Sequence, residues 1–295
     1  MLYQAIHTTT YEYEQPVTHC LSEARLTPRT LTRQNVHSTR LRVVPEPARQ
    51  EERLDYFGNG VTTYSIFKSH QELVATATSV VEVLPFGNPV LPAISWEASQ
   101  RRLAAHTDAD SLAAYEYLFD STYVAASPEL TEYAQPCFCK GRPLAELVQE
   151  LSHRIYEEFS YKPKSTSIEV PLAAVLERRQ GVCQDFAHVM IGALRSWRLA
   201  ARYVSGYLRS GSDVQGAEAS HAWVSVFIPD FGWLDLDPTN DVIPSEGHIT
   251  LAWGRDYGDV TPIKGIALGG GEQTVEVAVD VRPVGSVARG EALGA

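Results

Sequence analysis

One stretch of the chain decides its architecture: residues 181–197 read GVCQDFAHVMIGALRSW. The apolar side chains that recur there at helical spacing are Phe186, Val189, Met190, Ala193, Leu194 and Trp197. This spacing predicts an amphipathic helix. Gly181 supplies a turn, which puts Cys183 at or just inside the N-terminus of that helix. Unpaired N–H groups and the helix dipole favour a thiolate there, while an inert buried cysteine is the alternative.

Length, composition and charge limit what the chain can be. Its 295 residues, with 44% apolar and 21% charged residues, suggest about two domains with a sizeable core. A formal net charge of −11 argues against nucleic-acid binding, because that depends on clustered Lys and Arg. Four irregularly spaced cysteines do not make a disulfide framework. Without a membrane-spanning run or a secretory signal, the protein is expected to be cytoplasmic, with no membrane partner.

Residues 1–85 read as an all-β domain. The segments rich in β-branched and aromatic residues are 3–13, 41–45, 61–67 and 73–83. The first is expected to stop at Gln15-Pro16. Since no helical period longer than two turns appears, we predict a β-sandwich. The proline-rich run Pro85–Pro92 marks the boundary to the next domain.

Residues 86–282 are predicted to form an α+β domain, with helices first and an antiparallel sheet after them. A second amphipathic stripe, from Leu144 to Phe159, follows Pro143 and indicates another helix. Strands are expected over residues 201–208, 221–228, 233–237 and 274–281. Residues 283–295 are small and polar, and read as a loose tail.

Residues 220–240 read SHAWVSVFIPDFGWLDLDPTN and predict a β-hairpin with a Pro-Asp-Phe-Gly turn. If Phe227 opposes Trp233, His221 stands diagonal to Asp237, within reach of one hydrogen bond. A register shifted by one residue would turn Asp237 to the other face. We favour the first register because it gathers the polar residues of both strands on one side.

The helix and the hairpin together carry the groups of a nucleophilic site. Cys183 would be a nucleophile, His221 a base, and Asp237 the carboxylate that orients the imidazole. In the favoured register the other acid of the second strand, Asp235, points at Ser225 instead. The sequence therefore predicts a Cys-His-Asp triad with Asp237 as its third member.

Several motifs in order resemble the bacterial transglutaminase-like family, a branch of the papain-like cysteine enzymes. In the second domain they are Gly181–His188, Ala201–Tyr207, Ser220–Trp223, Asp237–Asn240, Gly254–Tyr257 and Gly271–Thr274. In the first domain, His7–Tyr11, Arg25–Arg29 and Asp55–Asn59 are similar to the all-β N-terminal domain of that family. The resemblance extends to about Val281. It implies a transglutaminase core after the β domain.

The resemblance also implies an activity. Cys183 is implied as the nucleophile, His221 as the general base and acid, and Asp237 as the residue that holds the imidazole. The thiolate would attack a carboxamide or peptide carbonyl, and water or an amine would resolve the thioester. The expected partner is a protein or peptide that donates a glutamine or peptide amide, with hydrolysis slightly favoured over amine transfer. A binding or assembly module that keeps the fold without turnover is the alternative, and the oligomeric state is not indicated.

Further pocket candidates come from the same motifs. They are Tyr161, Gln184, Asp185, Tyr207, Trp223 and Tyr257. Tyr161 and Gln184 are alternative second oxyanion donors beside the Cys183 N–H group. Asp185 can cap the first helical turn or face the pocket, and the three aromatic residues can wall the cleft, although Trp223 can equally pack over the helix.

No cofactor or metal is expected. The acidic run 235–246 lacks the glycine and the flanking helices of a calcium loop. Cys137 and Cys139 have no second ligand pair nearby for zinc. His188 lies five residues beyond Cys183, so it is expected to be a hydrogen-bonded structural residue.

Overall fold

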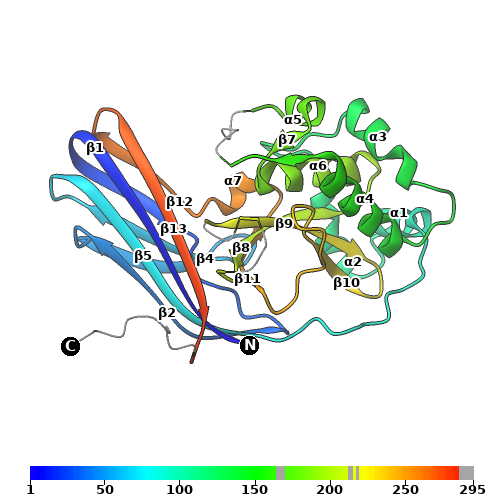
Figure 1. Cartoon of the computed structure of the whole chain (residues 1–295), viewed down its shortest axis with the longest axis horizontal. Helices are drawn as coiled ribbons and strands as arrows, with labels where there is room; N and C mark the ends of the chain where they lie inside the picture. The colour runs from blue at the N-terminus through cyan, green and yellow to red at the C-terminus, as the bar shows by residue number, and fades with distance from the viewer. Residues whose placement is uncertain (164–169, 212–214, 217–218, 286–295) are drawn as a thin grey trace, which may run out of the picture.

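The computed structural model describes residues 1–163, 170–211, 215–216 and 219–285. A β-rich part forms one side of the molecule, and a part of helices around a second sheet forms the other (Figure 1). Within the described ranges, no helix has the length and apolar character needed to cross a membrane. The cytoplasmic location stays a prediction.

The β-rich part is one antiparallel sheet of seven strands. Its members are β1 (Leu2–Ala24), β2 (Gln34–Val44), β3 (Arg49–Leu54), β4 (Gly60–Ile66), β5 (His70–Val83), β12 (Ile263–Gly269) and β13 (Gln273–Pro283). The first half of β1 lies between β5 and β13, and its second half lies between β4 and β12. The four segments predicted as strands all lie in this sheet.

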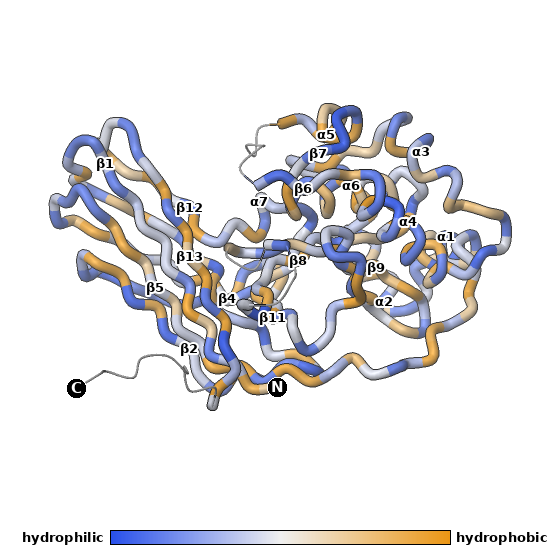
Figure 2. The backbone as a smooth tube through the Cα atoms, viewed as in Figure 1, coloured by the Kyte–Doolittle hydropathy of each residue, from blue (hydrophilic) through white to orange (hydrophobic). Residues whose placement is uncertain are grey.

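Two details of this sheet differ from the expectation. β1 does not stop at Pro16; its pairing with β5 lapses between Glu12 and Val17, and proline is tolerated where no ladder bond is required. Strand β3 was not predicted, because all six of its residues are exposed and show no apolar alternation. In β5, by contrast, apolar and polar residues alternate (Figure 2), and nearly every second side chain is buried.

The core of the β-rich part is built by β1, β2, β4 and β5. Its buried side chains are Tyr13, Val17, Cys20, Ala24, Leu26, Val43, Tyr64, Ile66, Leu73, Ala75 and Ala77. Because β1 exchanges its neighbours halfway along, the strands that enclose this core are hydrogen-bonded into a single sheet. The antiparallel β region expected from the sequence is therefore one continuous sheet, whose two halves share the long strand β1.

The last strand of the chain belongs to a different sheet from the one expected. Residues 274–281 were predicted to join the sheet of the second domain, and this was wrong. Instead β13 pairs with β1, from Tyr3 opposite Pro283 to Tyr13 opposite Gln273. The β-rich part thus takes in both ends of the described chain, whereas the predicted division put all of 86–282 in one domain. Alternation of apolar residues predicts a strand with one buried face, but it does not predict which sheet the strand joins.

The second part packs helices on a four-stranded sheet of order β10-β9-β8-β11. The strands are β8 (Ala201–Leu208), β9 (His221–Ile228), β10 (Gly232–Leu236) and β11 (His248–Gly254). The helices are α1 (Trp96–Ala105), α2 (Ala109–Tyr115), α3 (Pro128–Ala134), α4 (Leu144–Glu158), α5 (Leu172–Arg178), α6 (Cys183–Ser196) and α7 (Tyr257–Val260). Two single turns, Glu116–Leu118 and Gln135–Cys137, and the short pair β6 (Ser160–Tyr161) and β7 (Gln180–Gly181) complete it. The two predicted helices are confirmed as α4 and α6.

The register of the hairpin is the predicted one. Phe227 pairs with Trp233, and Ser225 pairs with Asp235. The other face of β9 carries Ala222, Val224, Val226 and Ile228, which are buried in one core together with the apolar residues of α6. Helix α6 therefore covers one face of the sheet, and His221 starts the polar face of β9.

Two side-chain amides join the parts by pairing with the edge strand β11. Asn59 Nδ2 donates to Trp253 O (2.9 Å), and Trp253 N donates to Asn59 Oδ1 (3.0 Å). Gln34 Nε2 donates to Thr250 O (2.7 Å), and Thr250 N donates to Gln34 Oε1 (2.8 Å). Arg29 also donates to Asn59 Oδ1 (2.5 Å). Motif 55–59 therefore acts as a docking element between the two parts.

We predict that Asn59→Ala lowers the free energy of unfolding by about 1–3 kcal/mol, because it leaves the backbone groups of Trp253 unpaired in a buried place. Urea unfolding measures the change. Asn35→Ala is the matched control, since that amide is exposed, and its effect should stay within about 0.5 kcal/mol. Equal effects of the two substitutions would contradict the docking role.

Candidate active site

Cys183 is the first residue of α6, as the sequence predicted. Asp185 Oδ2 accepts the N–H of Val182 (2.8 Å), which fixes the turn before the helix. The Asp185 carboxylate folds back so closely that a Cβ on Gly181 would lie 2.5 Å from Asp185 Oδ2, and glycine alone avoids this clash. The capping role expected of Asp185 is therefore observed. The thiol itself is buried, with 8% of the residue exposed.

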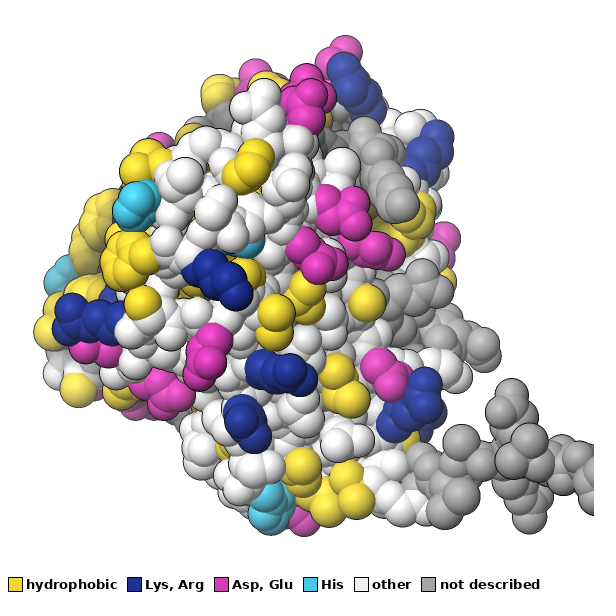
Figure 3. Space-filling view, turned by 90° about the vertical axis from the view of Figure 1, so that its left-hand side faces the viewer, with side chains coloured by type: hydrophobic (Ala, Val, Ile, Leu, Met, Phe, Trp, Pro, Cys, Tyr) yellow, Lys and Arg dark blue, Asp and Glu magenta, His cyan; other side chains and the backbone are white. Residues whose placement is uncertain are grey.

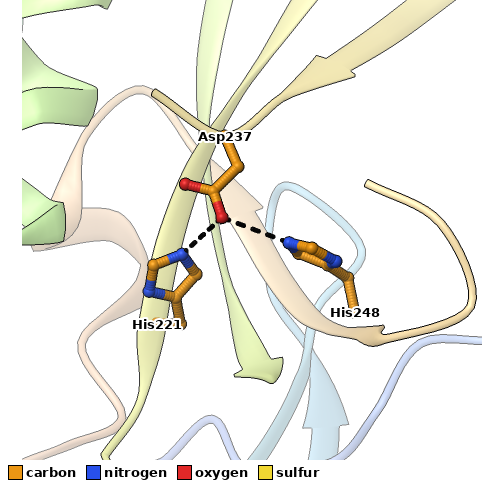
Figure 4. A group of neighbouring side chains, drawn as sticks. All are labelled: His221, Asp237 and His248. Carbon is orange, nitrogen blue, oxygen red and sulfur yellow. Dashed lines mark hydrogen bonds and ion pairs between the residues drawn. The ribbon is translucent and has the colours of Figure 1, made fainter. Parts of the chain in front are cut away.

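His221 is hydrogen-bonded to Asp237, and both are fully buried. His221 Nε2 donates to Asp237 Oδ2 (2.8 Å) (Figure 4). The second ring nitrogen, Nδ1, is buried and has no well-formed hydrogen bond among the described residues. Burial alone would lower the pKa of His221, but the Asp237 carboxylate and, after it, the Cys183 sulfur together raise that pKa to about 10. The imidazole is therefore held in its protonated form, next to the cysteine.

The Asp237 carboxylate is the centre of a hydrogen-bond network. Oδ2 accepts from His221, from His248 Nε2 (3.2 Å) and from Asn240 Nδ2 (2.9 Å), and Oδ1 accepts from Thr239 N (3.0 Å). Burial would raise the pKa of Asp237, but His221 and His248 hold it well below its usual range. A buried carboxylate with this set of donors stays ionised.

Sequence reasoning missed His248. It lies on β11, which is separated from β9 by β8 in the sheet, so no spacing rule of the hairpin could point to it. Figure 4 shows His221 and His248 approaching Asp237 from opposite sides. The only signal in the sequence was a histidine close after the Asp237–Asn240 motif.

The same three side chains also form a donor set for a metal ion. Ligand atoms of His221, Asp237 and His248 lie within 4.8 Å of one another. Two imidazoles and a carboxylate suit zinc. Hydrogen bonds account for this arrangement without an ion, because each imidazole donates from Nε2 to the Asp237 carboxylate.

A cavity of about 780 Å³ contains both Cys183 and His221. Three of the predicted pocket residues, Tyr161, Gln184 and Tyr257, line it. Tyr203 and Ser205 of β8 line it too and were not predicted. Three residues of β13, 275–277, also contribute, so the β-rich part forms one wall of the cavity.

Two predicted wall residues lie elsewhere, and their assignment to the cleft is corrected. Tyr207 is 2% exposed and packs against His7 of β1, with 5.6 Å between the ring centroids. Trp223 lines a separate cavity of about 230 Å³, where its ring lies 5.3 Å from that of His248. Tyr207 shares its strand face with Tyr203 and Ser205, and Trp223 shares its face with His221, so each lies further along its strand than the part that borders the Cys183 cavity.

His188 is a structural residue, as predicted. Its Nε2 accepts the N–H of Tyr257 (3.2 Å), and its ring stacks on Tyr123 with 6.1 Å between centroids. Burial lowers the pKa of His188 to about 4, so the ring is neutral. His188 thus holds Tyr257 at the cavity and takes no proton itself.

Comparison with known proteins identifies the family. Residues 3–82 match the family described as the bacterial transglutaminase-like N-terminal region, and residues 131–238 match the transglutaminase-like superfamily. The chain belongs to the bacterial transglutaminase-like family. A Mycobacterium tuberculosis protein without a described function is 39% identical over 296 residues, covering 95% of this chain and 92% of the relative. The two family matches thus fall in both parts of the molecule.

Two further proteins resemble this chain. A Cytophaga hutchinsonii protein, provisionally described as a cysteine protease, superposes with a TM-score of 0.74 at 21% identity, over 96% of this chain and 91% of that one. Its likeness confirms the α+β fold, an antiparallel β region followed by a helix-and-sheet core. The Pseudomonas aeruginosa protein-glutamine gamma-glutamyltransferase is 33% identical over 111 residues, which are 34% of this chain and 16% of that protein.

We predict that Asp237→Asn changes how stability depends on pH. Folding raises the pKa of His221 from 6.5 to about 10, so this contribution is fully present below about pH 6.5 and is lost as the pH rises through about 10. Asp237→Asn removes the carboxylate that raises this pKa. The difference in unfolding free energy between native protein and variant should therefore shrink across that range.

Urea unfolding at several pH values between about 6.5 and about 10 measures this difference. Asp235→Asn is the matched control, because Asp235 pairs with Ser225 and lines the other cavity. Its pH profile should run parallel to that of the native protein. A constant difference for Asp237→Asn would contradict the proton-linked role of the Asp237–His221 pair.

Proposed function

We propose that this protein catalyses cysteine-dependent acyl transfer at amide bonds, with Cys183, His221 and Asp237 as the catalytic triad. One observation carries the proposal: an imidazole held by a buried carboxylate shares a cavity with a cysteine at a helix N-terminus. The helix N-terminus and the cation both favour a thiolate. A nucleophile, a proton carrier and an orienting group are then present together.

The proposed reaction has two halves. The Cys183 thiolate attacks the carbonyl carbon, and the C=O electron pair moves onto oxygen to give a tetrahedral oxyanion. The imidazolium of His221 then gives its proton to the departing amine as the C–N bond breaks, which leaves a thioester on Cys183. In the second half His221 takes a proton from the acceptor, the acceptor attacks the thioester, and Cys183 leaves as thiolate.

The oxyanion needs at least two donors. The backbone N–H of Cys183 is one, since the first N–H groups of a helix have no partner within the helix. Tyr161 and Gln184 both line the cavity and are the side chains proposed for the second donor. Replacing the true second donor should lower kcat by about a hundredfold or more, with a smaller effect on KM.

The proposed substrate is a protein or peptide amide, either the carboxamide of glutamine or a peptide bond. The Pseudomonas relative, a protein-glutamine gamma-glutamyltransferase, supports the glutamine carboxamide. We propose water as the main acceptor and an amine as the alternative. Mass spectrometry of a glutamine peptide turned over with and without a primary amine measures the two products, and a dominant amine adduct would reverse this order.

We predict that iodoacetamide at mildly acidic pH labels Cys183 faster than Cys139. Cys139 is the exposed free thiol, so it is an internal control that accessibility alone would favour. Faster labelling of the buried Cys183 requires an enriched thiolate. Intact-mass measurement and peptide mapping follow both sites. His221→Gln should slow labelling at Cys183 and leave Cys139 unchanged; preferential labelling of Cys139 in the native protein would favour a non-catalytic binding module.

We also predict that Cys183→Ala abolishes turnover of an amide peptide while the protein stays folded. Asp237→Ala should lower kcat at least about tenfold more than Asp235→Ala, since only Asp237 bonds to His221. Steady-state kinetics with circular dichroism of each variant make the comparison. Full activity of Cys183→Ala, or equal effects of the two aspartate substitutions, would overturn the triad.

A further inference from the structure

Along the outer edge of β13, several backbone groups have no hydrogen-bond partner among the described residues. Val281 N donates to Ser210 Oγ (2.8 Å) and Ser210 N donates to Val281 O (3.0 Å), so the backbone of Val281 points away from β1. Backbone direction alternates along a strand, so Val275, Val277 and Val279 also turn their N–H and C=O groups outward. Within the described residues, no hydrogen bond reaches these outward groups.

This edge faces the Cys183 cavity. Val275, Glu276 and Val277 all line it. Neighbouring side chains on a strand point to opposite faces, so three consecutive residues can border one cavity only if the edge of the strand is turned toward it. On the face drawn in Figure 3, hydrophobic, acidic and basic side chains are interspersed. The edge of β13 is thus the feature of the β-rich part that reaches the reactive cysteine.

The side chains along this edge combine exposed valines with a few charged residues. Val275 is 50% exposed and Val277 is 39% exposed. Open edges are normally protected by charged residues, proline or bulges, because they pair readily with another chain. Here Glu276 is the only acidic residue among the described residues that line the cavity. Such an edge suits an extended chain with apolar residues opposite the valines and a basic residue near Glu276.

We propose that the substrate adds to β13 as an extended strand, pairing with the outward backbone groups of Val275, Val277 and Val279. This rests on the proposed acyl transfer at Cys183 and names its substrate class: an extended polypeptide segment with the reactive amide within it. Backbone pairing supplies affinity, and pairing along the cavity wall sets where the amide lies relative to the thiol. The β-rich part is then half of the substrate site.

The test compares two variants at one position. Val277→Pro removes an outward N–H group without touching the ladder to β1, whereas Val277→Ala keeps that N–H group and loses only the side chain. The peptide probe is about seven residues long, with a central glutamine between valine, threonine and lysine. The small probe is N-acetylglutamine methylamide, which is too short to pair along the strand. Thermal unfolding checks that both variants fold.

We expect Val277→Pro to lower kcat/KM for the peptide about ten times more than it lowers kcat/KM for the small amide. Val277→Ala should fall between native protein and Val277→Pro. In the Cys183→Ala protein, the peptide should slow hydrogen exchange at the amides of Val275, Val277 and Val279. An equal fold-change in kcat/KM for both probes on Val277→Pro, or no protection of these amides, would overturn strand addition.

The two proposals fail in different ways. If the native protein turns over neither probe, the proposal of acyl transfer at Cys183 is wrong. The exchange measurement still decides whether a peptide binds the β13 edge. If both probes are turned over but the β13 amides stay unprotected, acyl transfer stands and strand addition is wrong.

Discussion

A single buried carboxylate organises the second part of the molecule. Asp237 is 0% exposed, and such a charge is tolerated only when donors surround it. Those donors come from β9, from β11 and from the turn after β10, so one side chain ties three segments together. The bond to His221 uses Nε2 and leaves Nδ1 available. The hydrogen bond that stabilises the buried Asp237 carboxylate thus also orients His221, the proposed proton carrier.

Three buried histidines show how decisive this carboxylate is. Burial lowers the pKa of His7 and of His188 to about 4, and both rings are therefore neutral. His221 is equally buried, yet its pKa is raised to about 10, because Asp237 and Cys183 lie beside it. The same desolvation acts on all three rings. A hydrogen-bonded carboxylate, and not exposure, separates His221, the proposed proton carrier, from the two neutral rings.

The β-rich part supports the site in two ways. Gln34 and Asn59 pair with β11, the strand that brings His248 to Asp237. At the same time β13 returns from the end of the chain to form a wall of the Cys183 cavity. Both connections depend on elements far apart in sequence. A core without its β-rich partner would lose the support of β11 and one wall of the cavity.

Local rules in the sequence determined the helices α4 and α6, the place of Cys183 at a helix start, and the hairpin register that joins His221 to Asp237. Each depends on periodicity or turn chemistry within about twenty residues. Tertiary structure alone decided the rest. His248 lies next to Asp237 from β11, which is two places from β9 in the sheet. Strand β13 pairs with β1. Tyr207 and Trp223 pack outside the Cys183 cavity. These placements depend on which apolar surfaces pack together between segments far apart in the chain. A local sequence pattern does not contain that information.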